Sequence, residues 1–167
     1  KIVNLRYFNP IGAHPSGLIG ENFSSKSDNL FPHICMVASG EKKYLEIFGN
    51  DWPTDDGTCI RDYIHVLDLA EAHMSAIQML CSSNSKIVNI NIGTGKGTSV
   101  LELAKIFEKV NKCKIPIIFS ERRRGDIPFS VADNSFALEI LNWFPKRNID
   151  DMCRDGWQWL NKNPNGY

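Results

Sequence analysis

The sequence predicts an α/β fold, and three observations lead to that prediction. Segments rich in apolar and β-favouring residues alternate along the chain with segments whose apolar residues recur at helical spacing. The first of these segments, residues 2–8, is mostly apolar, which is typical of a strand that is buried on both faces of a parallel sheet. No linker or low-complexity stretch divides the chain, so we expect a single structural unit over residues 1–167.

In the first half of the chain, turn formers and capping residues set the bounds of the expected elements. Asn29 precedes an apolar run at helical spacing and Gly40 follows it, which predicts a helix with Pro32 in its first turn. Asp68 is the expected N-cap of a second helix, which ends near Leu80. The other expected elements are a strand at 2–8, a loop at 9–28, a strand at 44–48, a loop at 49–61 and a strand at 62–66.

The second half continues the alternation. Ser99 and Glu102 form an S-x-x-E capping box, which predicts a helix from Ser99 with Phe107 on its buried face. Trp157 and Leu160 are expected to be buried on the final helix. The other expected bounds are strands at 86–92 and 115–119, a loop at 120–132, and helices at about 135–141 and 150–162.

Composition excludes several classes of protein. An apolar fraction of 43% with four Trp indicates a packed globular body, and zero net charge argues against a nucleic-acid or anionic-membrane partner. No apolar stretch approaches 18 residues and no secretory signal is visible. Five scattered Cys without a CxxC motif favour reduced thiols and a cytoplasmic location. The chain starts without Met inside an expected strand, so we expect it to be part of a longer protein.

Arg61 is a candidate anion ligand because it stands where a loop opens onto a strand. Its planar guanidinium can make two charge-assisted hydrogen bonds to one anion from a rigid position. Arg123 and Arg124 can supply further cations, although three consecutive arginines are also typical of a solvated basic patch. Gly125 and Asp126 follow directly, and a carboxylate can accept hydrogen bonds from ribose hydroxyls.

Other segments offer groups for a nucleotide. The expected strand that ends at Glu46, Ile47 and Phe48 would present backbone groups to the amide-like edge of a base and an aromatic ring to its face. The alternative is an ordinary edge strand with a core Phe. Asn9 follows the first strand, at the edge of the sheet where ligands bind, or it simply starts an Asn-Pro turn.

Two further features favour structural interpretations. The glycine loop at residues 93–97 is not a Walker A motif, because Gly97 follows Lys96 where Ser or Thr is required, and Thr98 breaks G-x-G-x-x-G. We therefore interpret it as a tight turn between strand and helix. His65 and His73 have no carboxylate at metal-ligand spacing to both, and we expect His73 to be buried or half-buried on the apolar helix face. No metal site is predicted.

The motifs resemble those of one family. Leu5-Arg6-Tyr7-Phe8-Asn9-Pro10-Ile11-Gly12-Ala13-His14, together with the run from Phe48 through Arg61-Asp62-Tyr63 to Val66, closely resembles UDP-glucose 4-epimerases of the extended short-chain dehydrogenase family. The resemblance extends from about residue 3 to Tyr167 and covers only the C-terminal half of that family. It implies the last part of a Rossmann-type sheet plus the small substrate-binding α/β domain, with the NAD-binding half absent.

The resemblance also implies roles for individual residues. Tyr7 and Phe8 would lie against the nicotinamide end of NAD, and Arg124 stands where the family more often has an acidic residue. Ser130 would face the hexose C2 substituent, where a small residue leaves room for an N-acetyl group. The implied UDP-sugar ligands are Asn9, Asn29, Leu30, Glu46, Ile47, Phe48, Arg61, Arg123, Arg124, Gly125, Asp126 and Ser130.

The implied reaction is the interconversion of UDP-glucose and UDP-galactose in galactose metabolism, with NAD taking and returning a hydride at C4. The base in that family is a Tyr of a Tyr-x-x-x-Lys motif, and no such motif occurs in these 167 residues, so no catalytic residue is expected here. The implied parent is a homodimer whose interface is mostly outside this chain. Two alternatives remain: another NAD-dependent nucleotide-sugar enzyme, such as a dehydratase or decarboxylase, and a non-catalytic nucleotide-sugar-binding module.

Overall fold

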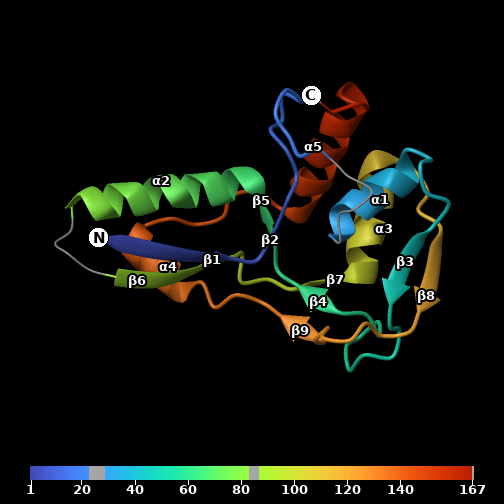
Figure 1. The fold of residues 1–167 in the computed structure, drawn as a ribbon, viewed down its shortest axis with the longest axis horizontal. Coiled ribbons are helices and arrows are strands. Elements are labelled where there is room, and N and C mark those ends of the chain that lie inside the picture. The colour runs from blue at the N-terminus through green and yellow to red at the C-terminus, as the bar shows by residue number, and fades with distance from the viewer. Residues whose placement is uncertain (23–28, 83–86, 167) are drawn as a thin grey trace.

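The structure is a computed structural model that describes residues 1–22, 29–82 and 87–166. Its architecture is α/β, as the sequence predicts, and Figure 1 shows two groups of elements side by side. We call β1, β6, α2 and α4 the sheet lobe, and α1, β3, α3, β8 and α5 the pocket lobe. Residues 23–28 of the expected loop and residue 86 of the expected strand lie outside the described residues.

The sheet lobe is built on two parallel strands. β1 (Ile2–Tyr7) pairs with β6 (Ile87–Ile92) over its whole length, and α2 (Val66–Ser82) and α4 (Ser135–Leu141) pack against them. The apolar faces of these elements, with Ile64 and Trp143 from neighbouring segments, form one core, which contains Ile64, Leu69, Ala72, Ala76, Ile90, Ile92, Ala137, Leu141 and Trp143.

The pocket lobe has a second core. β3 (Leu45–Phe48) runs parallel to β8 (Ile117–Ser120), and the helices are α1 (Leu30–Ala38), α3 (Val100–Asn111) and α5 (Ile149–Lys162). Phe107 of α3 is fully buried at its centre, with edge-to-face contacts to Phe31 at 5.9 Å and to Trp157 at 5.7 Å between ring centroids.

Short strands connect the two lobes. β2 (Asn9–Ile11) is parallel to β5 (Tyr63–His65), and β4 (Ile60–Arg61) lies between β7 (Thr98–Ser99) and β9 (Phe129–Ser130). β2, β4, β7 and β9 are only two or three residues long, too short for a periodic pattern, and fell in expected loops or next to a predicted helix start. They nevertheless position Asn9, Arg61 and Ser130.

Most expected helix bounds agree with the structure within one or two residues, and the Ser99–Glu102 capping box is formed. The expectations for the burial of β1 and for the start of α2 are wrong. β1 is not buried on both faces, because Ile2 and Tyr7 are 50% and 53% exposed. α2 begins at Val66, so Asp68 is not its N-cap; it lies in the first turn and accepts hydrogen bonds from the backbone N–H groups of residues 146 and 147. Within the described residues, no helix has the length and apolarity needed to cross a bilayer.

Candidate functional site: a cavity with a cationic end

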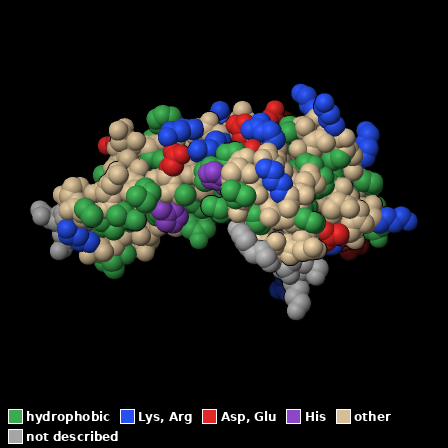
Figure 2. All heavy atoms as spheres, turned by 90° about the horizontal axis from the view of Figure 1, so that it is seen from above, with side chains coloured by type: hydrophobic (Ala, Val, Ile, Leu, Met, Phe, Trp, Pro, Cys, Tyr) green, Lys and Arg blue, Asp and Glu red, His purple; other side chains and the backbone are tan. Residues whose placement is uncertain are grey.

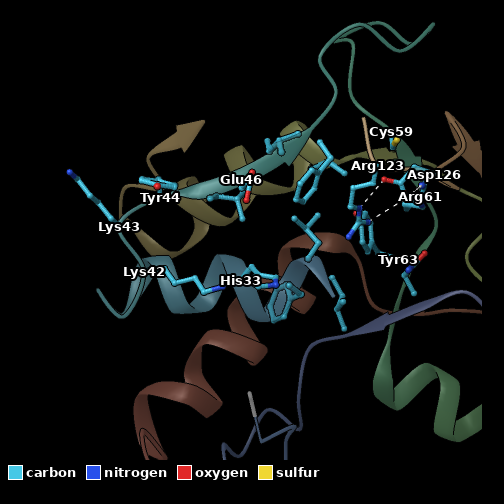
Figure 3. A pocket seen from close by; sticks show the side chains of 18 residues that line it. His33, Lys42, Lys43, Tyr44, Glu46, Cys59, Arg61, Tyr63, Arg123 and Asp126 are labelled. Atoms are coloured by element: carbon cyan, nitrogen blue, oxygen red, sulfur yellow. Dashed lines mark hydrogen bonds and ion pairs between the residues drawn. The ribbon is translucent and has the colours of Figure 1, made fainter. Parts of the chain in front are cut away.

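A cavity of about 730 Å³ opens between β3, α1 and the short strands (Figure 3). This is within the typical range for small-molecule sites, roughly 300–1,000 Å³. It brings together predicted residues from distant parts of the chain: Asn9, Leu30, Glu46, Ile47, Phe48, Arg61, Arg123 and Asp126.

One end of the cavity is cationic. Arg61 donates from Nη1 to the carbonyl of Ile127 at 2.8 Å, and its Nη2 lies 3.9 Å from Oδ1 of Asp126. Arg123 donates from Nε to Oδ2 of Asp126 at 3.1 Å. Figure 3 shows the three side chains pointing toward one another. Two guanidinium groups share one carboxylate, so this cluster has an excess positive charge that suits a multivalent anion.

The wall next to this end is the edge strand β3. The N–H groups of Leu45 and Gly49 donate to Pro116 and Ser120, at 2.7 and 2.8 Å, on the side of β8. Because backbone groups alternate along a strand, those of Glu46 and Phe48 point away from β8, toward the cavity that both residues line. The Phe48 carbonyl accepts from Trp52 Nε1 at 3.2 Å, and the guanidinium of Arg123 lies 4.8 Å from the Phe48 ring centroid.

Arg122 has a different role from Arg123. Its Nε donates to Oδ1 of Asp51 at 2.7 Å, and its guanidinium lies 4.1 Å from the centroid of the Trp52 ring. These contacts hold the loop at 49–59 beside the cavity. The same loop requires Gly57, which has φ +76°, because a Cβ there would lie 2.1 Å from the carbonyl oxygen of Asn50.

Sequence reasoning missed several cavity residues. Tyr63 is 5% exposed and lines the cavity, and burial raises the pKa of its hydroxyl well above the usual range, so it stays a neutral donor. Its position two residues after Arg61, on an extended segment, was a usable signal. At the far end, Lys42 Nζ lies 2.7 Å from His33 Nδ1, and no motif marks this pair. The other missed lining residues are Ile11, Phe31, Lys43, Tyr44, Leu45, Cys59 and Val100.

The remaining predicted site residues do not line this cavity. Asn29 occupies the N-cap position of α1, but its side chain makes no capping hydrogen bond. Arg124 is exposed, and Gly125 forms a turn with φ +93°. Ser130 is the strand partner of Arg61 in the β4–β9 pair.

Tyr7 and Phe8 lie at the carboxyl end of β1. The Tyr7 ring is half-exposed, and its centroid is 6.1 Å from that of His73. The expectation that His73 is buried or half-buried is therefore wrong: it lies on the exposed side of α2, because this helix carries apolar residues on both sides and its buried face contains Leu69, Ala72 and Ala76 instead.

The glycine loop after β6 binds an internal carboxylate. Asp62, which is fully buried, accepts hydrogen bonds from the N–H groups of Thr94 at 2.8 Å and Gly95 at 2.9 Å. The loop amides are thus already occupied within the protein, which supports the structural interpretation. Among the described residues, no group of three His, Cys, Asp or Glu side chains could hold a metal ion.

His65 belongs to the link between the lobes. It is fully buried, accepts from the Leu67 N–H at Nδ1, and its Nε2 lies 3.3 Å from Oδ2 of Asp155 on α5. Burial lowers the pKa of His65, against the opposing effect of Asp155. We therefore interpret His65 as a structural residue whose imidazole joins the Leu67 N–H to Asp155.

Comparison with known proteins identifies the family of the chain. Residues 1–156 match the family model described as GDP-mannose 4,6 dehydratase. The chain is 50% identical over 167 residues to a UDP-glucose 4-epimerase of Bacillus subtilis (strain 168), covering 100% of this chain and 49% of that protein.

Solved structures of UDP-glucose 4-epimerases are similar to this chain. The UDP-glucose-4-epimerase of Stenotrophomonas maltophila, with bound NAD and formylated UDP-arabinopyranose, has a TM-score of 0.95 at 47% identity, covering 98% of this chain and 48% of that one. The Bifidobacterium longum enzyme, in complex with NAD+ and UDP, has a TM-score of 0.94 at 46% identity, covering 100% and 49%. The chain therefore spans about half the length of the relatives it matches, and the predicted resemblance to UDP-glucose 4-epimerases over part of their length is confirmed.

Proposed function

The chain belongs to the extended short-chain dehydrogenase family described by the GDP-mannose 4,6-dehydratase model, and on that premise we propose that it is the UDP-sugar-binding half of a UDP-hexose 4-epimerase. The whole protein would interconvert UDP-glucose and UDP-galactose, a reaction of galactose metabolism. Residues 1–167 act as a single unit in this proposal.

The observation that carries the proposal is the convergence of Arg61, Arg123 and Asp126 at one end of the cavity. The two guanidinium groups suit a diphosphate, and the carboxylate suits ribose hydroxyls. The backbone groups of Glu46 and Phe48 on the edge of β3 away from β8 suit the amide-like edge of uracil, and the Phe48 carbonyl, which accepts from Trp52 Nε1, has a second lone pair for the base. An epimerase must hold the nucleotide firmly and the hexose loosely, and two arginines at one end of the cavity suit firm binding of the nucleotide diphosphate.

NAD is the proposed cofactor, and Tyr7 and Phe8 are the residues of this chain that would lie against its nicotinamide. A half-exposed aromatic ring at the carboxyl end of a parallel strand fits that role, because ligands bind at this edge of open α/β sheets. When bound, NAD supplies a hydride acceptor for the sugar. Without a Tyr-x-x-x-Lys motif, these residues supply binding and orientation, so the chain alone should not catalyse the reaction.

The other proposed properties concern partners and location. Five free thiols favour a reducing cytoplasm, and we propose a homodimer whose interface lies mostly outside this chain. Nucleic acid and membranes are not proposed as partners, given the zero net charge.

Arg61→Ala in the full-length protein tests the proposal. Binding of UDP should weaken by about 2–5 kcal/mol, the range for truncating one partner of a buried charge pair. Arg124→Ala is the matched control, since Arg124 is exposed and outside the cavity, and UDP affinity should stay within about twofold of wild type. Equal UDP affinity for Arg61→Ala and wild type, measured by calorimetry, would contradict the proposal.

The competing functions make different predictions. Thermal stabilisation by UDP but not by dTDP or GDP favours the epimerase over dehydratases that act on those nucleotides. A non-catalytic binding module would bind UDP without any turnover in the full-length protein. Epimerase activity of the full-length protein, assayed with UDP-glucose, separates these two outcomes.

Substrate range is a finer proposal that rests on Ser130. Ser130 is the strand partner of Arg61, so it lies beside the proposed diphosphate site, and its small side chain excludes little. We expect the full-length protein to act on UDP-N-acetylglucosamine as well as UDP-glucose. Ser130→Tyr should abolish the N-acetyl activity and spare the glucose activity. A wild type with no N-acetyl activity would show that the argument is wrong.

A further inference from the structure

Asp62 is a buried carboxylate directly after Arg61, which lies at the cationic end of the cavity. It lies between two cavity residues, Arg61 and Tyr63, yet its own side chain is fully buried. Four groups donate to this carboxylate: the N–H of Thr94 at 2.8 Å, the Thr94 hydroxyl at 2.6 Å, the N–H of Gly95 at 2.9 Å and the N–H of Ala132 at 3.2 Å.

The backbone of Asp62 joins two more segments. Its carbonyl accepts from the N–H of Asn9 at 3.0 Å, and its N–H donates to the carbonyl of Ser130 at 3.1 Å. One residue thus connects β2, the glycine loop and β9, and the first and last of these carry predicted substrate ligands. These are the segments on both sides of the proposed diphosphate site.

The glycine loop is shaped to this carboxylate. A Cβ at Gly93 would lie 2.5 Å from Oδ2 of Asp62 and 2.6 Å from Cβ of Ala132, so only glycine allows the approach. Gly95 has φ +72°, which turns its N–H toward the carboxylate. A loop geometry that elsewhere cradles a phosphate here binds a side chain of the same protein.

We propose that Asp62 is a positioning residue for nucleotide-diphosphate binding. By fixing the backbone between Arg61 and Tyr63 against three segments, it holds both cavity side chains in place before the ligand arrives. Such preorganisation strengthens binding because the ordering cost is met in the free protein. The proposal rests on the proposed function, since its ligand is UDP.

The test is Asp62→Asn in the full-length protein. The amide keeps the size of the side chain but replaces one acceptor oxygen with an NH2 group, which faces N–H donors and cannot accept from them. UDP affinity should fall at least tenfold by calorimetry, and KM for UDP-glucose should rise more than kcat falls.

Asp68→Asn is the matched control. Asp68 is also fully buried and also accepts several hydrogen bonds, from the N–H groups of Lys146 and Arg147 and from the Arg147 guanidinium, but it does not line the cavity. Both variants should lower the melting temperature, and only Asp62→Asn should weaken UDP binding. Equal weakening by both, or by neither, overturns the positioning role.

Thr94→Val decides the matter if Asp62→Asn does not fold. It removes the hydroxyl donor to Asp62, together with the hydrogen bond that this hydroxyl accepts from the Lys96 N–H at 3.2 Å, and keeps the side-chain shape, so the folded variant should bind UDP about threefold more weakly. Unchanged affinity in this variant would overturn the proposal. A wild-type protein that fails to bind UDP overturns the proposed function itself, which distinguishes the two failures.

Discussion

The outer faces of α2 and α3 differ, although each helix buries one apolar face in its own lobe. The exposed residues of α3 are charged: Glu102, Lys105 and Lys109. The exposed residues of α2 include Val66, Met74 and Ile77, at 37%, 58% and 53% exposure, and Figure 2 shows hydrophobic side chains gathered over the α2 end of the molecule.

The strands show this contrast only in part, because Ile118 and Phe119 of β8 in the pocket lobe are also 38% and 47% exposed. Leu45 and Ile47 of β3 are 1% and 2% exposed, whereas Ile2 and Tyr7 of β1 are half-exposed. A helix that is apolar on both sides is typical of a buried position. The outer face of α2, unlike that of α3, therefore offers an apolar surface that suits the other half of the proposed full-length protein.

The largest expected effect is in the core of the pocket lobe. Phe107→Ala should lower the free energy of unfolding of the full-length protein by about 3–5 kcal/mol, because it removes a fully buried ring with two aromatic neighbours. Phe144→Ala is the control: this ring is 61% exposed, and the change should stay within about 0.5 kcal/mol. Similar losses for both variants in urea denaturation would show that the lobe core is not as packed as described.

The next effect tests the outer face of α2 directly. Ile77→Lys should destabilise the full-length protein by on the order of 3 kcal/mol, because it would bury an unpaired charge between α2 and the other half of the full-length protein. In the 167-residue chain expressed alone, the same change should raise solubility, since it breaks an exposed apolar surface.

Lys105→Glu on the outer face of α3 is the control for that experiment. Lys105 is exposed on a charged face, and its electrostatic attraction to Asp56 lies within the pocket lobe, so its replacement should change the stability of either protein by no more than about 0.5 kcal/mol and should not change solubility. If Ile77→Lys lowers the stability of the isolated chain as much as that of the full-length protein, the outer face of α2 is not an interface.

A third effect concerns the link between the lobes. The pKa of His65 is lowered in the folded state, so the unfolded state binds the proton more tightly. Stability should therefore be fully present above about pH 6.5, the ordinary value for His, and should decrease as the pH falls below it. Urea denaturation between pH 8 and pH 5 measures this.

Two variants test whether His65 causes that pH dependence of stability. His65→Gln should remove it, whereas His73→Gln should retain it, because His73 is exposed on α2. A pH dependence that survives His65→Gln unchanged would mean that another group is responsible.

The sequence predicted long elements well and short ones poorly. The capping box at Ser99 and Glu102 was recognisable because its signal is local. The start of α2 was placed three residues late, because an N-cap at Asp68 would make Leu69 the first helical residue and the helix begins at Val66. Asp is a common N-cap residue, yet the partners of Asp68 are backbone groups far along the chain, at Lys146 and Arg147. A distant partner leaves no trace in local sequence.

The same reasoning applies to the cavity. Arg61 and Asp126 were identifiable because their residue types and neighbours suit an anion and a ribose. Tyr63 stands two residues after Arg61 on an extended segment and therefore points to the same side, but this signal was not used and Tyr63 was missed. Lys42 and His33 meet at 2.7 Å only because the chain turns back between α1 and β3, and this tertiary contact has no sequence pattern.

The smallest effect tests how far the pocket lobe is stabilised by its own helix ends. Both α3 and α5 begin with a capping box, in which Ser99 and Asn148 accept from the N–H groups of Glu102 and Asp151, each at 2.9 Å. Asn148→Ala removes only this cap and should lower the free energy of unfolding by about 1 kcal/mol. Ser99→Ala should cost more, because the Ser99 hydroxyl also donates to Asp56, whose carboxylate would lose a partner. Urea denaturation of both variants gives the order, and a larger loss for Asn148→Ala would contradict the argument that Ser99 joins the cap of α3 to the loop beside the cavity.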